Sequence, residues 1–381
     1  MSTYLSPMFE FLEPVAIHEI TGDGAAKEGQ YGKLVHVWDP ETDETDSWQQ
    51  ADIIIVGVHE ERGKGIVAEN HHTHAIRRQF YQLFCWHEGI KIADLGNVRR
   101  GDTLNDTYSA LSSVLDECYQ HNKTVVILGG SHDLTLAQYQ VFAKNKVPVE
   151  ISCVDAAIDL SLESPFRNEN FLMQLLTGEP NYTRHYNHIG FQSYFVHPRM
   201  MVTLEQLRFD CFRLGRVREQ LPEMEPVIRN SDMLSIDVSA LQPACMPCNH
   251  SSPNGFAGDE ACSLARYAGM SSKMRSIGIY NYNAFEDANE LGALQIAQMI
   301  WYFIDGQRQL KEEIAAGERE NFNEYHLPVA GTDTLFLQHK KTGRWWMQLP
   351  GNRLIACSAR DYALASHNEI PERWLRAMER D

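Results

Sequence analysis

The segment Thr124-Val-Val-Ile-Leu-Gly-Gly-Ser-His-Asp133 joins a short apolar run to two glycines, a histidine and an aspartate. Such a run is typical of a β-strand that is buried on both faces. Five further runs have the same character: Asp52–Val58, Lys91–Leu95, Val149–Asp155, Met233–Asp237 and Ser276–Tyr280. Segments with helical spacing of apolar residues separate or follow them: His74–Phe84, Leu104–Gln120, Leu134–Phe142, Asp259–Ala268 and Glu290–Gln309. The alternation predicts a three-layer α/β/α sandwich with a mostly parallel central sheet, whose ligands bind at the carboxyl ends of the strands.

The sequence pattern changes after about residue 310. A charged helical segment is followed by two short runs, Thr334–His339 and Arg344–Leu349, which predict an antiparallel pair. A terminal helix is expected after Pro371, because proline is favoured at the start of a helix. We therefore predict a main domain over residues 1–310 and an appendage over residues 311–381, packed on that domain or on a neighbouring subunit.

The composition restricts the class of protein. The 381 residues include 34 Lys and Arg against 51 Asp and Glu, a formal net charge of −17, which excludes nucleic-acid binding driven by counterion release. No window approaches the roughly 18 uninterrupted apolar residues of a membrane span, so no membrane partner is expected. Eight cysteines are scattered along the chain rather than grouped as a disulfide framework, which predicts a reducing, cytoplasmic location.

Acidic residues and a histidine occur where three of the predicted strands end. His132 follows the strand Thr124–Leu128, Asp155 and Asp159 follow the strand that begins at Val149, and Asp237 ends another. Residues two apart in extended backbone share a face, so Asp155 and Asp159 can converge. Carboxylates with one imidazole indicate a divalent cation site, with Mn²⁺ the natural choice and Zn²⁺ or Mg²⁺ as alternatives.

Three motifs support a family resemblance. They are Gly-Gly-Ser-His at residues 129–132, Asp-Ala-Ala-Ile-Asp at 155–159, and the stretch from Ser235 to Pro247. In order and spacing they resemble the Gly-Gly-x-His, Asp-Ala-His-x-Asp and Ser-x-Asp-x-Asp-x-x-Asp-Pro-x-x-x-Pro motifs of the arginase, agmatinase and formimidoylglutamase family, the ureohydrolases. The resemblance covers roughly residues 50–305. Residues 252–256 and 298–303 place the sequence nearest the formimidoylglutamase branch.

The resemblance implies metal ligands, and two of them are missing. In the family, two Mn²⁺ ions share a bridging hydroxide. The ligands of the deeper ion are all present: His132, Asp155, Asp159 and Asp237. The second ion's own ligand positions hold Ala157 and Ser239. Ala157 has no atom that can bind a metal, and the neutral hydroxyl of Ser239 is a weak ligand. The resemblance therefore implies one ion per chain at most, with Asp159 and Asp237 as candidate catalytic residues. The alternative is that the four side chains share protons or bind water instead of an ion.

Further departures from the family pattern affect substrate binding. Asn281 stands where relatives carry the carboxylate that closes on the cationic part of the substrate, and an amide cannot pair a charge. Gln242 replaces the Asp before the proline of the third motif, and no histidine occurs between residues 159 and 184, where arginase-like members carry a proton shuttle. Glu61 and Arg62 lie in a loop that forms the pocket rim in the family and are candidate substrate contacts, with a solvated charged turn as the alternative.

Two functions of different class follow from the resemblance. The first is a formimidoylglutamase-like or arginase-like hydrolase of the C–N bond of a formimino or amidino amino acid, weakened by its single ion. The alternative is a catalytically silent relative that keeps the pocket to bind a ligand or partner. Relatives are commonly trimers or hexamers, so the resemblance also implies a homo-oligomer.

Two other groups of residues suggest sites on first inspection. Cys245 and Cys248 form a lone Cys-x-x-Cys, which is usually just part of a loop. His71, His72 and His74 crowd the start of a predicted helix, but their spacing does not place all three on one helical face. We expect them to be capping and surface residues.

Overall fold

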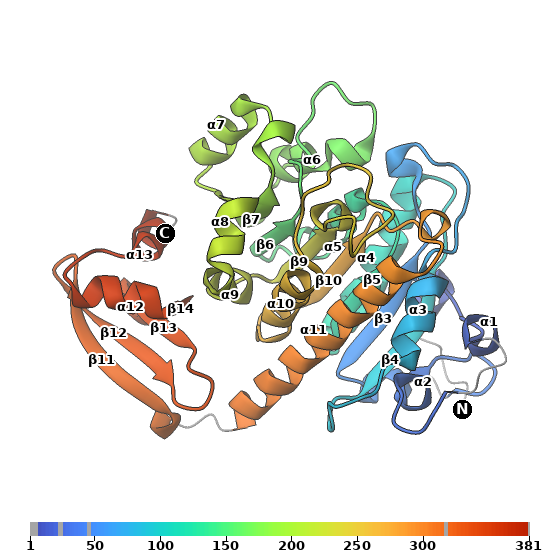
Figure 1. Ribbon diagram of the computed structural model, residues 1–381, viewed down its shortest axis with the longest axis horizontal. Coiled ribbons are helices and arrows are strands. Elements are labelled where there is room, and N and C mark those ends of the chain that lie inside the picture. Colours follow the sequence, from blue (N-terminus) through green and yellow to red (C-terminus); the bar gives the residue numbers. More distant parts are fainter. Residues whose placement is uncertain (1–6, 22–25, 44–46, 316–318, 380–381) are drawn as a thin grey trace.

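The computed structural model describes residues 7–21, 26–43, 47–315 and 319–379, and its centre is a twisted sheet between two layers of helices (Figure 1). This ten-stranded sheet has the order β1-β4-β3-β5-β10-β9-β6-β7-β8, with β2 also paired to β4. The strands are β1 (Leu12–Glu13), β2 (His36–Val37), β3 (Ile53–Val58), β4 (Ile92–Val98), β5 (Thr124–Leu128), β6 (Val149–Val154), β7 (Thr183–Phe191), β8 (Asp210–Arg213), β9 (Met233–Asp237) and β10 (Ser276–Tyr280). The β1–β4 pair is antiparallel and the other pairs are parallel, so the predicted fold class is confirmed.

The helices that cover the sheet are amphipathic segments of the expected kind. One layer contains α3 (Thr73–Gln82), α10 (Gly258–Gly269) and α11 (Leu291–Ala315), and the other contains α4 (Leu104–Gln120) and α5 (Thr135–Lys144). The shorter helices are α1 (Ile17–Thr21), α2 (Tyr31–Leu34), α6 (Phe171–Thr177), α7 (Pro198–Gln206), α8 (Leu214–Glu219), α9 (Met224–Arg229), α12 (Ala359–Ser366) and α13 (Glu372–Glu379). No helix of the described residues combines the length and hydrophobicity that a membrane span requires.

Strand β3 shows why the apolar runs are continuous. Ile53 and Ile55 pack with the cluster that includes α10 and α11, whereas Ile54 and Val56 pack with the cluster that includes α4 and α5. Because successive side chains point to opposite faces and both faces are covered, every position of the strand must be apolar.

The carboxyl ends of four central strands meet at one edge of the sheet. The order β5-β10-β9-β6 makes these strands direct neighbours, and Tyr280 pairs with Asp237 at the last position of β10 and β9. After β5 the chain turns through Gly129 and Gly130, which have φ angles of +81° and +76°. A Cβ on Gly130 would lie 2.2 Å from the side chain of Leu134, so both the backbone angle and the space require glycine.

Strands β7 and β8 are absent from the predicted set because their polar residues hide the strand pattern. β7 reads Thr-Arg-His-Tyr-Asn-His-Ile-Gly-Phe, and most of it is buried. The buried His185 satisfies its Nε2 with Asp210 of β8, 3.0 Å away. Hydrogen bonding of this kind allows polar side chains inside a sheet core.

The C-terminal part forms a second sheet, antiparallel, with the order β11 (Phe322–Val329), β12 (Thr332–His339), β13 (Trp345–Leu349) and β14 (Arg353–Cys357). The predicted strand pair is β12 with β13, and the prediction of two strands only was wrong, because β11 and β14 flank that pair. Helix α11 continues to Ala315, so the charged segment after residue 310 belongs largely to it. Helix α13 follows Pro371 as predicted.

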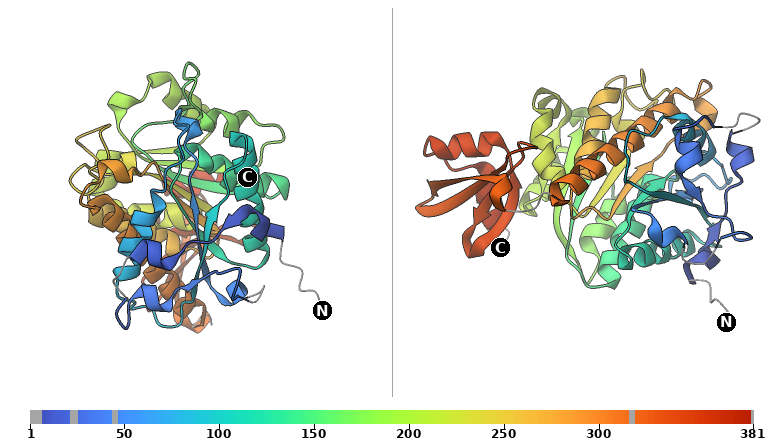
Figure 2. Two further views of the ribbon diagram at one scale, coloured as in Figure 1. Left: turned by 90° about the vertical axis from the view of Figure 1, so that its right-hand side faces the viewer. Right: turned by 90° about the horizontal axis from the view of Figure 1, so that it is seen from below.

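This C-terminal sheet lies beside α8 and α9 at one end of the molecule (Figure 2). Arg344 Nη1 donates to the backbone oxygen of Met270 at 2.7 Å, and Arg229 Nη2 donates to that of Trp345 at 2.8 Å. The guanidinium of Arg229 also lies 4.3 Å from the ring centroid of Trp346. The appendage is therefore joined to the main domain by buried arginines.

Asp232, just before β9, makes the stability of the fold depend on pH. Burial raises its pKa to about 6, although the backbone N–H of Glu150 donates to its Oδ2 at 2.7 Å. The stability that this raised pKa contributes is present below the unfolded pKa of about 4 and is lost as pH rises through about 6.

Asp232→Asn keeps a hydrogen-bond acceptor at this position without the charge. We expect it to increase the unfolding free energy by about 1–2 kcal/mol at pH 8 and hardly at pH 4 in urea titrations. An equal effect at both pH values would contradict this assignment.

Candidate metal centre

The four predicted ligands of the deeper ion converge at the edge where the central strands end. His132 follows β5, Asp155 and Asp159 follow β6, and Asp237 is the last residue of β9. The Nδ1 of His132 lies 3.0 Å from an oxygen of Asp159, 3.4 Å from Asp237 and 3.5 Å from Asp155. Ligand atoms of His132, Asp155 and Asp237 all lie within 4.8 Å of one another. The arrangement offers one nitrogen and three carboxylates to a common point.

Hydrogen bonds behind His132 determine which ring nitrogen faces this point. Thr135 Oγ1 donates to the backbone oxygen of His132 at 2.7 Å, so the hydroxyl of Ser235, 2.6 Å away, must donate to Thr135. The oxygen of Ser235 then accepts the N–H of His132 Nε2 at 2.9 Å. Because each hydroxyl has one proton, this chain leaves Nδ1 as the nitrogen that takes a proton or a cation.

The four side chains of this centre are electrostatically coupled. Although burial alone would lower it, the pKa of His132 is raised well above its ordinary value by Cys153 and by the carboxylates that accept its N–H. Burial and the negative charge of Asp155 raise the pKa values of Asp159 and Asp237. The pKa of Asp155 is lowered despite its burial, because it accepts a hydrogen bond from His132. Three buried carboxylates around one imidazole carry excess negative charge, which protons or a divalent cation can neutralise.

Protein donors occupy the side of the carboxylates that faces Ala157 and Ser239. Asp155 Oδ1 accepts from the hydroxyl of Ser239 at 2.9 Å and from the backbone N–H of Ala157 at 3.2 Å. Asp237 Oδ1 accepts from the backbone N–H of Ser239 at 2.7 Å. These donors supply part of the positive charge that a cation on this side would supply, and they leave a second cation without ligands of its own.

Asn281, just after β10, completes this layer of donors. Its φ is +65°, and its Nδ2 donates to Asp237 Oδ2 at 2.5 Å. Its Oδ1 is buried and has no hydrogen-bond partner among the residues that the structure describes. Since a buried acceptor without a partner is costly, this oxygen is ready to accept an N–H from a ligand.

Comparison with known proteins identifies the family of this fold and site. The sequence profile of the Arginase family matches residues 51–305. The chain belongs to the arginase family. Formimidoylglutamases from two strains of Vibrio cholerae serotype O1 are each 34% identical over 86 residues, which is 22% of this chain and 25% of theirs. This arginase-family chain thus matches about a quarter of the length of those curated relatives.

Solved structures of the family share the fold at low sequence identity. Formiminoglutamase of Trypanosoma cruzi, solved with Mn²⁺, is 17% identical with a TM-score of 0.65, over 74% of this chain and 99% of that one. Formimidoylglutamase of Bacillus subtilis is 15% identical with a TM-score of 0.66, over 76% and 95%. Proclavaminate amidino hydrolase of Streptomyces clavuligerus is 16% identical with a TM-score of 0.60, over 75% and 98%.

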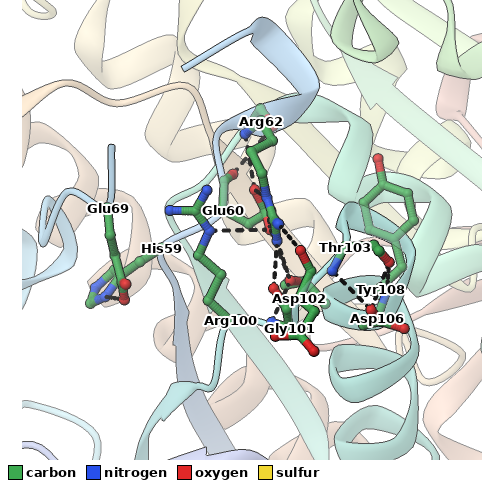
Figure 3. A network of polar contacts seen from close by, with 12 residues as sticks. His59, Glu60, Arg62, Glu69, Arg100, Gly101, Asp102, Thr103, Asp106 and Tyr108 are labelled. Atoms are coloured by element: carbon green, nitrogen blue, oxygen red, sulfur yellow. Dashed lines mark hydrogen bonds and ion pairs between the residues drawn. The ribbon is translucent and has the colours of Figure 1, made fainter. Parts of the chain in front are cut away.

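The candidate substrate contact Arg62 forms hydrogen bonds to other residues of the protein (Figure 3). Its Nε donates to the buried carboxylate of Glu60 at 2.9 Å. Its Nη1 and Nη2 donate to the backbone oxygens of Asp102 and Gly101 at 2.6 and 2.9 Å. Arg62 therefore ties the loop after β3 to the loop after β4, and a role toward a substrate stays a prediction.

The candidate substrate contact Glu61 is also paired internally. Its carboxylate lies 2.7 Å from Lys64 Nζ, accepts from Asn70 Nδ2 at 2.7 Å and lies 3.4 Å from His72 Nε2. Burial alone would raise the pKa of Glu61, but these partners lower it to about 2. His72 is itself buried, so the expectation that it is a surface residue was wrong. A substrate role for Glu61 likewise stays a prediction.

One residue behind the centre was not anticipated from the sequence. His188 of β7 is buried, and its Nε2 lies 3.3 Å from the backbone oxygen of Asp155. Tyr186 contacts its Nδ1 at 2.9 Å, and burial lowers the pKa of His188 to about 4. A neutral His188 thus supports the backbone that carries Asp155. The strand β7 that positions it gave no clear sequence signal.

The Cys-x-x-Cys pair lies in the loop after β9. Both cysteines are free and partly buried, and Cys245 Sγ donates to the backbone oxygen of Gln242 at 3.3 Å. Burial raises the pKa of Cys245 and raises that of Cys248 to about 11. Because redox chemistry and metal binding need the thiolate, these raised pKa values favour the interpretation as loop residues.

Proposed function

We propose that this arginase-family chain is a hydrolase that cleaves the C–N bond of a formimino or amidino amino acid with a single bound cation. Mn²⁺ is the preferred ion, with Zn²⁺ or Mg²⁺ as alternatives, and its ligands would be His132, Asp155, Asp159 and Asp237. The observation that carries the proposal is the convergence of three carboxylates on His132 Nδ1, whose other nitrogen is committed to Ser235. This donor set fits Mn²⁺, and the ion present in the T. cruzi relative supports that choice.

The residues around the cation can perform two parts of the reaction. When bound, the ion supplies Lewis-acid activation of water, and one ion does so less strongly than a pair. Asp159 is the most accessible of the three carboxylates, with 10% of its side chain exposed against 3% for Asp155, so it is the proposed proton acceptor. Asp237 is held by hydrogen bonds from Asn281 and Ser239 and orients the side chains around the cation.

Asn281 is the proposed contact to the substrate's reacting group. Its buried Oδ1 can accept one N–H of a formimino or amidino group, while its Nδ2 remains on Asp237. A neutral amide binds a cationic group less strongly than a carboxylate does. Slow turnover is therefore expected, and it should increase toward alkaline pH because a single ion lowers the pKa of bound water less than a pair does.

A catalytically silent relative that retains ligand or partner binding is the second candidate. It is favoured by the donors on Asp155 and Asp237, since hydrogen bonds from Ser239 and Asn281 stabilise these carboxylates without an ion. In this case the centre would be a buried polar network that fixes the strand ends, and no product would form.

Metal analysis combined with product assays separates the two candidates. Protein prepared with Mn²⁺ would be tested for formamide and urea release from formiminoglutamate, agmatine and arginine, with metal-free protein as the baseline. Asp159→Asn is the matched variant, because it removes one proposed ligand and proton acceptor at nearly constant volume. The hydrolase predicts product above the baseline that disappears in Asp159→Asn. No product from protein that holds Mn²⁺ would identify the silent relative.

A further inference from the structure

A second cluster of metal-ligating side chains lies on the loop between β3 and α3. His59 follows β3 directly, His71 precedes α3, and His74 lies in its first turn. Their ligand nitrogens all lie within 4.8 Å of one another, and the rings of His59 and His71 have centroids 4.5 Å apart. His71 is exposed and His74 partly exposed, as expected of surface residues, but both lie against the buried His59, which the helical spacing does not indicate.

A buried network fixes the ring of His59. Arg77 Nη1 lies 2.8 Å from the Asn97 amide, and because a guanidinium can only donate, the amide atom there is Oδ1. Arg77 Nη1 also donates to Thr73 Oγ1 at 3.1 Å. The Thr73 hydroxyl lies 2.8 Å from His59 Nε2 and 3.4 Å from Asn97 Oδ1. In the tautomer with the proton on Nε2, His59 donates to the Thr73 oxygen, and the lone pair of Nδ1 faces a cation. A hydrogen bond behind the ring of this kind is the support that ligating histidines usually have.

A carboxylate faces the same nitrogen. Glu69 Oε1 lies 4.0 Å from His59 Nδ1, and 42% of the Glu69 side chain is exposed (Figure 3). His71 is exposed as well, while His59 is 4% exposed. The cluster thus has one rigid buried imidazole and partners at the surface that can rotate toward it.

We infer that His59, His71, His74 and Glu69 form a zinc site that is separate from the carboxylate-rich centre. Zn–N bonds of about 2.0–2.1 Å in a tetrahedral site place ligand atoms about 3.4 Å apart, so modest rotations of the surface side chains close the site. Three imidazoles favour Zn²⁺, whereas three carboxylates and one imidazole favour Mn²⁺. The two clusters lie at the ends of different strands, with His59 after β3 and His132 after β5.

Chemical modification of histidines tests the site residue by residue. Metal-free protein would be treated with diethyl pyrocarbonate with and without Zn²⁺, and modified peptides would be quantified by mass spectrometry. We expect Zn²⁺ to abolish modification of His71 and His74, and a chelator to restore it. The exposed His197 and His367 serve as internal controls whose modification stays constant. Equal modification of His71 and His74 with and without Zn²⁺ would overturn the inference.

A surface variant gives an independent measure. His71→Gln with His74→Gln removes two ligands without touching the buried His59 network, and His197→Gln with His367→Gln is the matched control. In calorimetric Zn²⁺ titrations, the first variant should bind one ion fewer per chain than the wild type, and the control should bind the same number. Unchanged Zn²⁺ binding in His71→Gln/His74→Gln would contradict the site. Because the product assays use the Mn²⁺ centre, their outcome does not affect this result.

Discussion

Ala157→His combined with Ser239→Asp should raise the number of Mn²⁺ ions per chain from one to two. The double variant adds an imidazole and a carboxylate beside Asp155 and Asp237, at the positions that the resemblance assigns to the second ion. It also removes the hydroxyl that donates to Asp155 Oδ1 at 2.9 Å. Equilibrium dialysis gives the ion count, and electron paramagnetic resonance distinguishes a coupled pair of Mn²⁺ ions from an isolated one.

The single variants are the controls for this result. Ala157→His and Ser239→Asp each restore one ligand, which leaves the second ion with too few ligands and too little compensating charge. Each should therefore still hold one ion. If the double variant also holds a single ion or none, the assignment of Ala157 and Ser239 to lost ligand positions is wrong.

Arg77→Leu should destabilise the protein by about 3–5 kcal/mol. Arg77 is 1% exposed and Asp94 is fully buried, and the two form a bidentate pair with distances of 2.8 and 2.9 Å. Removing the cation leaves a buried carboxylate without its counter-charge, which costs much more than losing an exposed pair. Urea unfolding monitored by circular dichroism measures the difference.

The neighbouring residue provides the control. Arg78 also forms an ion pair from helix α3, with Glu290, but the side chains are 35% and 28% exposed. Such pairs contribute about 1 kcal/mol or less, so Arg78→Leu should have a small effect. Similar destabilisation by Arg77→Leu and Arg78→Leu would show that burial of the Arg77–Asp94 pair does not determine its contribution.

The sequence predicts those strands whose two faces are both covered, because continuous apolar runs such as β5 and β9 have few other uses. The sequence does not predict strands that contain buried polar residues or a proline. β7 contains the buried His185, which contacts Asn187 and Asp210, and the buried His188, which contacts Tyr186, whereas β11 is an edge strand that tolerates Pro328. The C-terminal sheet was therefore only half predicted.

The primary site could be predicted because fixed short spacings bring its residues to the ends of adjacent strands. The histidine cluster could not, because its members are brought together by the return of a loop. His59 lies twelve positions before His71, and helical spacing alone considers only residues within α3. Periodicity gives the faces of regular elements, whereas the path of a loop depends on the tertiary contacts that Thr73 and Arg77 make.

Diffraction from crystals grown with Mn²⁺, recorded near the manganese absorption edge, counts and places the ions of the carboxylate-rich centre. We expect one anomalous peak per chain, in contact with His132 Nδ1 and the carboxylates of Asp155, Asp159 and Asp237. Two peaks bridged by Asp155 and Asp237, or a peak away from His132, would contradict it.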